Sequence, residues 1–203
     1  MSLETDIRRG ELALTELDPE LGTLITMQRP LTIRPRDGYF FSLCRSIIGQ
    51  QVSVATASTI FGRLQTLTAL DPVAVADLTD EAARAIGLSR QKISYIRDLA
   101  HHFVQNPDVY NHLDQSSDED VITELTAIKG IGVWTAQMFL MFTLHRLDIF
   151  APDDIGLQRA MKLLYGWDDL PDKSTIAGIT ERWRPYRTVA CWHLWESLHN
   201  SPA

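Results

Sequence analysis

Apolar residues recur every three or four positions through most of the chain, which is the spacing of one face of an α-helix. Nearly every segment that is long enough to judge shows this period rather than the two-residue period of a β-strand. The clearest examples lie in residues 40–64, 93–103, 157–164 and 191–198. The pattern therefore predicts an all-α fold.

Capping residues indicate where several of these helices begin and end. Asp71 stands before a proline and Asp80 before a glutamate, and each predicts the start of a helix. Ser117 and Ser174 are candidates to cap later helices. Gly87 is expected just beyond a helix end, because glycine adopts the left-handed conformation there without a steric penalty.

Composition leaves the function open. With 203 residues, 45% of them hydrophobic, the chain can bury a sizeable core in one domain or in two small lobes. Its net charge of -7 argues weakly against nucleic acid, but the acidic residues concentrate in segments expected to be peripheral, 4–20 and 114–124. The longest apolar run, Met138 to Leu144, is too short to span a membrane, so we expect a soluble, cytoplasmic protein.

Cys44 and Cys191 are the two cysteines of the sequence, and most of the chain separates them. This arrangement has neither the pattern of a disulfide framework nor the spacing of metal ligands. Both are predicted to be buried, reduced thiols.

The most informative stretch is LTAIKGIGVWTA at residues 125–136. Its two glycines make a tight turn whose bare backbone can approach another molecule closely. The N–H groups of the turn and the positive end of the next helix would bind a phosphate, with Lys129 as a cation beside them. A plain turn between two helices is the alternative. A dinucleotide site is excluded, because no strand precedes the turn and Thr135 stands in place of a third glycine.

This stretch resembles the hairpin of the helix-hairpin-helix DNA glycosylases, and especially the bacterial 3-methyladenine DNA glycosylase II group. Other stretches that resemble the family, in the same order, are RSIIGQQVSVATA, GLSRQKISYIRDLA, LDIFAPDDIGLQRA and RPYRTVACWHLWESL. The resemblance covers most of residues 37–198. It implies a compact form without the N-terminal β-rich domain of longer bacterial relatives.

The resemblance also implies the architecture. We expect a two-lobed, all-α fold with the active site in the cleft between the lobes. One lobe, residues 37–147, is expected to contain six helices and to end in the hairpin. The second lobe, residues 1–36 and 148–203, is expected to carry the catalytic aspartate. DNA contacts in the hairpin are expected from Lys129, Gly130, Ile131, Gly132 and Thr135.

Breaking an N-glycosidic bond develops positive charge on the sugar, so a nearby carboxylate lowers the barrier. Asp153 and Asp154 are the candidates, and the spacing from Asp154 to Arg159 matches the family segment better. Alternatively, either aspartate simply caps the helix that starts near Ile155. Both roles are compatible, because a carboxylate at a helix N-terminus is held in its charged form.

An enzyme that acts on a base in a duplex rotates it out of the stack into a pocket of aromatic or apolar side chains. Trp134 and Trp195 resemble the tryptophans that line this pocket in the family. Trp192, Phe40 and Tyr39 are weaker candidates, because an aromatic residue on a helix stripe usually belongs to the core.

The resemblance implies two further contacts with DNA. Gln50 and Gln51 end an apolar helix where, in the family, one residue wedges into the gap left by the base; we favour Gln51, and two polar residues at a helix end are the alternative. Main-chain carbonyls of Thr126, Ile128 and Ile131 are implied to hold an alkali-metal ion when DNA is bound.

Two departures from related branches narrow the chemistry. Trp134 stands where the endonuclease III branch has its Schiff-base lysine, so no lysine-dependent lyase activity is expected. Two isolated cysteines cannot hold the four-cysteine iron-sulfur cluster of that branch.

We therefore expect a monofunctional glycosylase that excises alkylated bases of the 3-methyladenine type from double-stranded DNA. It is expected to be a monomer, to need no cofactor and to work on the bacterial nucleoid. The alternatives are a non-catalytic helix-hairpin-helix module that binds DNA or damage, and a glycosylase for another damaged base.

Overall fold

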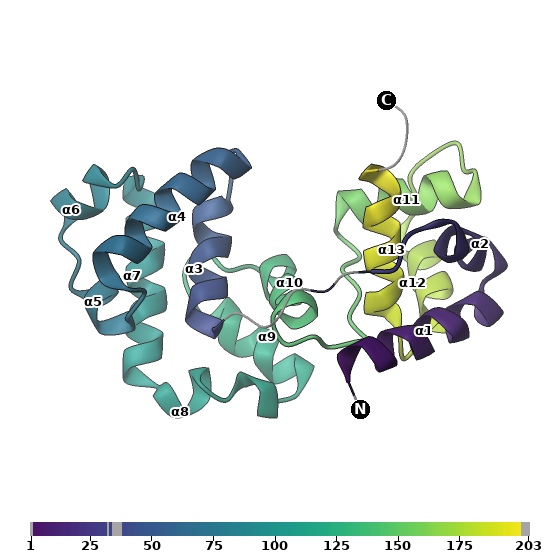
Figure 1. Cartoon of the computed structure of the whole chain (residues 1–203), viewed down its shortest axis with the longest axis horizontal. Coiled ribbons are helices and arrows are strands. Elements are labelled where there is room, and N and C mark those ends of the chain that lie inside the picture. The colour runs from purple at the N-terminus through teal and green to yellow at the C-terminus, as the bar shows by residue number, and fades with distance from the viewer. Residues whose placement is uncertain (1, 32, 34–37, 200–203) are drawn as a thin grey trace. The chain divides into compact units, whose positions relative to one another are not determined.

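The computed structural model describes residues 2–31, 33 and 38–199 (Figure 1). These residues form thirteen α-helices and two short 3-10 helices, and none of them lies in a β-strand. The all-α fold predicted from the hydrophobic period is therefore confirmed. In the same part of the chain, no helix combines the length and the apolar character that crossing a membrane requires.

The chain divides into two compact units. Unit 1 comprises Met1–Pro35 and His145–Ala203, and unit 2 comprises Arg36–Leu144. Unit 1 contains α1 (Leu3–Leu17), α2 (Pro19–Met27), α11 (Ile155–Tyr165), α12 (Lys173–Thr180), η2 (Glu181–Trp183) and α13 (Arg187–His199). Unit 2 contains α3 (Tyr39–Gly49), α4 (Val54–Thr68), α5 (Pro72–Ala76), α6 (Asp80–Ala85), α7 (Arg90–Gln105), α8 (Pro107–Tyr110), η1 (Leu113–Gln115), α9 (Asp118–Thr126) and α10 (Val133–Phe142).

The expectation of six helices in the hairpin lobe is wrong, because the described part of unit 2 has eight α-helices. Three of these eight, α5, α6 and α8, are only 5, 6 and 4 residues long. Such short helices end before a hydrophobic period can develop, so capping residues alone indicated α5 and α6, and the pattern of apolar residues does not reveal α8. The placement of the catalytic residues between two lobes stays a prediction.

In unit 1, α13 packs against α1, α2 and α11 (Figure 1). Leu157 and Met161 of α11 and Leu194 of α13 are fully buried in this core. Because the N-terminal helices and the C-terminal helices share one core, residues from both ends of the chain shape the surroundings of α11.

A buried aspartate strengthens the same core. Asp18 caps α2 and accepts hydrogen bonds from the Tyr165 hydroxyl at 2.6 Å and from the Trp183 indole N–H at 2.9 Å. Burial by itself would raise the pKa of Asp18, but these bonds, the Leu21 N–H and the nearby Arg182 outweigh burial and lower the pKa below its usual value. Asp18 is therefore a charged crosslink between α2, α11 and η2.

In unit 2, α7 is the central helix and packs against α3, α5, α6 and α8. Ile93, Ile96, Leu99 and Phe103 form its buried stripe. Two partly exposed polar residues of α7, Lys92 and Asp98, contact the turns that are predicted to bind DNA.

Three of the five predicted cap positions are confirmed. Asp71 accepts the Ala74 N–H at the start of α5, and Ser117 accepts the Asp120 N–H at the start of α9. Gly87 has a φ of +102° just beyond α6. These positions depend on neighbours within one helical turn, which the sequence displays directly.

The other two cap predictions are wrong by one or two residues. Thr79 caps α6, and Asp80 is the first helical residue, where its charge favours the positive helix end. Asp172 caps α12 and accepts a hydrogen bond from the Ser174 hydroxyl at 2.8 Å.

Both cysteines are buried and free, as predicted. Burial raises the pKa of the Cys44 and Cys191 thiols above the usual value, so they remain protonated at neutral pH.

Candidate functional site

Asp154 caps the start of α11. Its Oδ1 accepts the Leu157 N–H at 2.8 Å and the indole N–H of Trp195, on α13, at 3.2 Å. The residue is only 9% exposed, so the carboxylate is held in one orientation at the positive end of a helix. This is the setting that the predicted catalytic role requires.

The preceding aspartate lies in a different environment. The Asp153 side chain is 68% exposed and forms an ion pair with Lys173 at 2.8 Å. A solvated, paired carboxylate stabilises a developing positive charge far less than a buried one does. Geometry thus favours Asp154 over Asp153 as the catalytic carboxylate, and the catalytic role itself stays a prediction.

Two features hold Asp154 in place. A Cβ at position 156 would lie 3.0 Å from the Asp154 Oδ1 and 3.4 Å from the Trp195 ring, so Gly156 lets the two side chains meet. In the loop before Asp154, the Thr188 hydroxyl donates to the Arg146 carbonyl at 2.7 Å and accepts the Ile149 N–H at 2.9 Å. Helix α13 therefore anchors both the loop and the carboxylate.

The hairpin turn in unit 2 depends on its first glycine. Gly130 has a φ of +84°, and a Cβ there would lie 2.3 Å from the ring of Tyr95. Both observations require glycine at this position. Gly132 has an ordinary φ of -97° and open space around its Cα.

Helix α10 begins without a side-chain cap, because Gly132 occupies its N-cap position. Gly132, Val133 and Trp134 are all exposed. The first four N–H groups of a helix have no partner within the helix, and the helix dipole makes this end positive. An uncapped, exposed helix start is a suitable binding site for a phosphate.

Three other hairpin residues have side chains that are paired or buried, and their contacts with DNA stay a prediction. The Lys129 ammonium lies 3.3 Å from the Asp98 carboxylate, so its charge is partly neutralised. Ile131 is 5% and Thr135 is 7% exposed, so their side chains belong to the core of unit 2 and their main chain alone can face DNA. The burial of Ile131 and Thr135 could not be predicted from the hairpin motif, because the glycines alone define that motif.

The two glutamines in the turn after α3 have different environments. The Gln50 side-chain amide donates to the Gly130 carbonyl at 2.9 Å, so this side chain is tied to the hairpin. Gln51 is exposed and has a φ of +57°, a left-handed conformation that is uncommon outside glycine. The geometry favours Gln51 as the wedge, which stays a prediction.

A family profile, the HhH-GPD superfamily base excision DNA repair protein, matches residues 44–185. This chain belongs to the HhH-GPD superfamily. The resemblance inferred from the hairpin and the aspartate segment is therefore confirmed.

Solved structures of the HhH-GPD superfamily match nearly the whole chain. A crystal structure of DNA-3-methyladenine glycosidase from Bacillus halodurans is 37% identical with a TM-score of 0.85, covering 94% of this chain and 89% of that chain. The Schizosaccharomyces pombe 3-methyladenine DNA glycosylase in complex with abasic DNA is 27% identical with a TM-score of 0.82, covering 95% of this chain and 98% of that one.

A curated sequence relative agrees with these structures. DNA-3-methyladenine glycosylase 1 of Schizosaccharomyces pombe is 28% identical over 95% of this chain and 88% of its own length. Similarity over nearly full length in both directions is consistent with the compact form of the HhH-GPD fold.

The aromatic residues predicted to line an HhH-GPD base pocket fall into two groups. Trp134 is 48% exposed, and Trp195 is half-buried beside Asp154. In contrast, Trp192 is 5% exposed, and Phe40 is 7% exposed and packs edge-to-face on Phe103, with the ring centroids 5.1 Å apart. This burial favours the alternative that Trp192 and Phe40 are core residues, and their assignment to the base pocket stays a prediction.

Tyr39 is half-buried and meets Phe139 edge-to-face, with the ring centroids 5.7 Å apart. This contact anchors Tyr39 to α10, the helix that also carries Trp134. Its assignment to the base pocket stays a prediction.

The carbonyl groups predicted to bind an alkali-metal ion lie between α9 and α10. The Ile128 carbonyl accepts the Ile131 N–H at 3.1 Å. A carbonyl oxygen has two lone pairs, so this bond is compatible with a cation on the same oxygen. The carbonyl oxygens of Thr126, Ile128 and Ile131 are therefore chemically suitable ligands for such an ion.

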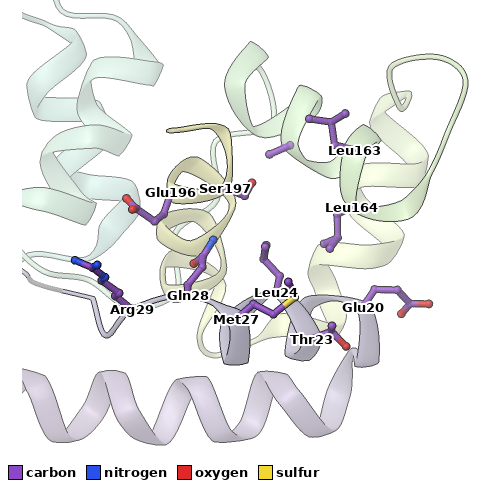
Figure 2. Close-up of a pocket in the computed structure, with 11 residues that line it drawn as sticks. Glu20, Thr23, Leu24, Met27, Gln28, Arg29, Leu163, Leu164, Glu196 and Ser197 are labelled. Carbon is purple, nitrogen blue, oxygen red and sulfur yellow. The ribbon is translucent and has the colours of Figure 1, made fainter. Parts of the chain in front are cut away.

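An open groove of about 960 Å³ lies within unit 1, between α2, α11 and α13 (Figure 2). Its apolar lining includes Leu24, Met27, Leu163 and Leu164, and its charged lining includes Glu20 and Glu196. None of the residues predicted from the sequence to bind or cleave DNA lines this groove.

Lys92 lies in the stretch GLSRQKISYIRDLA, which resembles the family, but its sequence context predicts no role for it. In the structure its ammonium donates to the carbonyls of Ile48 and Gln50, beside the predicted wedge. The sequence offered no local signal for this contact, because 44 and 42 residues separate the partners.

Proposed function

We propose that this chain is a monofunctional DNA glycosylase that excises alkylated bases of the 3-methyladenine type during base excision repair. One observation carries the proposal: a buried carboxylate, Asp154, is oriented by Trp195 at the start of α11 in a member of the HhH-GPD superfamily. The names and near full-length similarity of the relatives support the same substrate class.

Asp154 stabilises the positive charge that develops on the sugar as the N-glycosidic bond breaks, and it orients the attacking water. An alkylated purine such as 3-methyladenine already carries positive charge, so it leaves without a strong general acid. A rigid carboxylate is therefore sufficient for the bond cleavage.

The DNA is held by main-chain groups and by one wedge. The uncapped start of α10 binds a backbone phosphate without reading sequence. The carbonyls of Thr126, Ile128 and Ile131 would hold an alkali-metal ion, which would supply further positive charge at the hairpin. Gln51 occupies the gap left in the stack, and Trp134 covers the extruded base, where a cationic base is favoured by its ring.

The absence of a lysine at position 134 argues against lyase chemistry of the endonuclease III type. The expected products are therefore a free base and an intact strand with an abasic site. Alkali-labile sites without strand cleavage by the enzyme would agree with this mechanism.

The test is release of 3-methyladenine from methylated duplex DNA under single-turnover conditions. Asp154→Asn keeps a side chain that can cap α11 but removes the charge, so the rate constant should fall about a hundredfold to a thousandfold. Asp153→Asn is the matched control and should react like the wild type. The mechanism is wrong if the wild type frees no base or if Asp154→Asn keeps full activity.

The same assay separates the alternatives. A non-catalytic damage-binding module would bind DNA in a salt-sensitive manner and release no base. A glycosylase for another base would act on a different member of a panel of damaged duplexes. The DNA partner, the monomeric state and independence from a cofactor belong to the proposal.

A further inference from the structure

The turn after α3 and the hairpin rest on the same side of α7. Lys92, Tyr95 and Asp98 are spaced three residues apart on this helix, so they follow one another along its surface. Lys92 contacts the end of α3, Tyr95 lies against Gly130, and Asp98 contacts Lys129.

Lys92 is a cap for α3 that comes from another helix. Its Nζ donates to the Ile48 carbonyl at 2.6 Å and to the Gln50 carbonyl at 2.7 Å. The last carbonyls of a helix lack partners within it and carry the negative end of the dipole, so a cation is stabilising there. Partial burial lowers the pKa of Lys92 below its usual value through desolvation.

The turn that Lys92 caps has an unfavourable backbone conformation. Gln51 adopts a φ of +57°, where the Cβ of any residue other than glycine is crowded. Gln51 is exposed, so the contacts that hold it must come from its neighbours. Those contacts are the Lys92 bonds and the bond from the Gln50 amide to the Gly130 carbonyl.

The hairpin is fixed to α7 by two further residues of this helix. The ring of Tyr95 fills the space where a Cβ of residue 130 would be. The Asp98 carboxylate accepts the Lys129 N–H at 2.8 Å and pairs with the Lys129 ammonium at 3.3 Å. The spacing between the turn after α3 and the hairpin is thus set by one rigid helix.

We propose that Lys92 is a positioning residue that holds Gln51 in its wedge conformation at a set distance from the phosphate-binding hairpin. The inference rests on the proposed function. Lys92 acts through the carbonyls of the turn and not through the reacting atoms. Its removal should therefore slow base extrusion and release while leaving the binding of undamaged DNA intact.

The activity test compares Lys92→Met with Lys92→Arg, which keeps donors for the two carbonyls. The matched control is Lys162→Met, since the Lys162 ammonium also donates to a main-chain carbonyl, that of Asp168 at 2.5 Å. Lys92→Met should lower the single-turnover rate constant about tenfold, because small misplacements at a site reduce rate strongly. Lys92→Arg should recover most of the rate, and Lys162→Met should match the wild type.

A second readout reports positioning directly. Hydrogen exchange at the amides of residues 50–53 in the free, full-length protein should accelerate in Lys92→Met and stay unchanged in Lys162→Met. The fluorescence of a 2-aminopurine placed beside an abasic-site analogue in the DNA reports how far the neighbouring base unstacks. Lys92→Met should cause less unstacking than the wild type does. If Lys92→Met folds poorly, Gln50→Leu removes only the amide bond to Gly130 and should shift both readouts in the same direction.

Two outcomes overturn the inference. One is a Lys92→Met protein that behaves like Lys162→Met in rate and exchange. The other is an equal loss of affinity for undamaged duplex, which would make Lys92 a general contact with DNA. If the wild type releases no base but exchange and 2-aminopurine unstacking still respond to Lys92→Met, the proposed activity fails while the positioning role stands.

Discussion

Asp18 and Asp154 have the same local role at two helix starts of unit 1. Each caps a helix, accepts the N–H of the residue three positions later and receives an indole N–H from a tryptophan. Their surroundings differ. Asp18 is 1% exposed and accepts side-chain donors from both α11 and η2, whereas Asp154 is 9% exposed and accepts the Leu157 N–H and the Trp195 indole N–H.

The comparison shows how one motif serves two purposes. Asp18 is surrounded by donors from α11 and η2, so its charge is used to hold the fold together. Asp154 accepts an N–H of α11 and the Trp195 indole N–H while 9% of its surface stays exposed, which suits the predicted role of a carboxylate that acts on another molecule. What packs around a capping aspartate thus determines which role it can take, and each prediction below alters the start of a helix.

The largest expected effect comes from Asp18→Asn. The amide NH2 would face the donors of Tyr165 and Trp183, so we expect a loss of about 3 kcal/mol in the free energy of unfolding. Urea unfolding followed by circular dichroism measures it. Base release by the folded variant at low temperature should match the wild type. If Asp18→Asn lost less free energy of unfolding than Asp154→Asn, the structural role would belong to Asp154 and not to Asp18.

Next is Gly132→Asp, which gives α10 the kind of cap that α2 and α11 have. The backbone at Gly132 accepts any residue, and a Cβ there meets no atom within 4 Å. The new carboxylate should repel DNA phosphate and lower affinity about tenfold, with no loss of stability. Fluorescence anisotropy with duplex DNA tests this, with Gly132→Ala as the uncharged control. Unchanged affinity would remove the start of α10 from the DNA interface.

Asp154→Ser and Asp154→Ala separate capping from charge at α11. Serine still caps a helix, so Asp154→Ala should unfold more easily than Asp154→Ser by about 1 kcal/mol. Both should lose base release to a similar degree, because neither carries a charge. Thermal unfolding and the release assay together check this. Activity retained in the serine variant would mean that the hydrogen bond, and not the charge, matters.

The smallest effect is the response to acid. The folded-state pKa of Asp18 is lowered, so its stabilisation is present above the unfolded pKa of about 3.9 and is lost as the pH falls through the folded value. The difference in stability between wild type and Asp18→Asn should therefore be constant from pH 7 to about 5 and shrink below about 4. Urea unfolding across this range tests the sign. A difference that grows on acidification would contradict it.

The sequence by itself determined the features that depend on near neighbours. The helical period, the caps at Asp71 and Ser117, and the glycine turn at Gly130 all involve residues within about one helical turn of each other. The resemblance of LDIFAPDDIGLQRA to a known segment also led to the prediction of a catalytic carboxylate at one of two adjacent positions.

Only the tertiary structure decided which candidate is buried, tied or exposed. Asp154 is distinguished from Asp153 by Trp195, which is 41 residues away, and Gln51 from Gln50 by a bond to Gly130, which is 80 residues from Gln50. Phe40 became a core residue because Phe103 packs on it. Periodicity reports the face of a helix, but burial and hydrogen bonding depend on what the folded chain brings against that face.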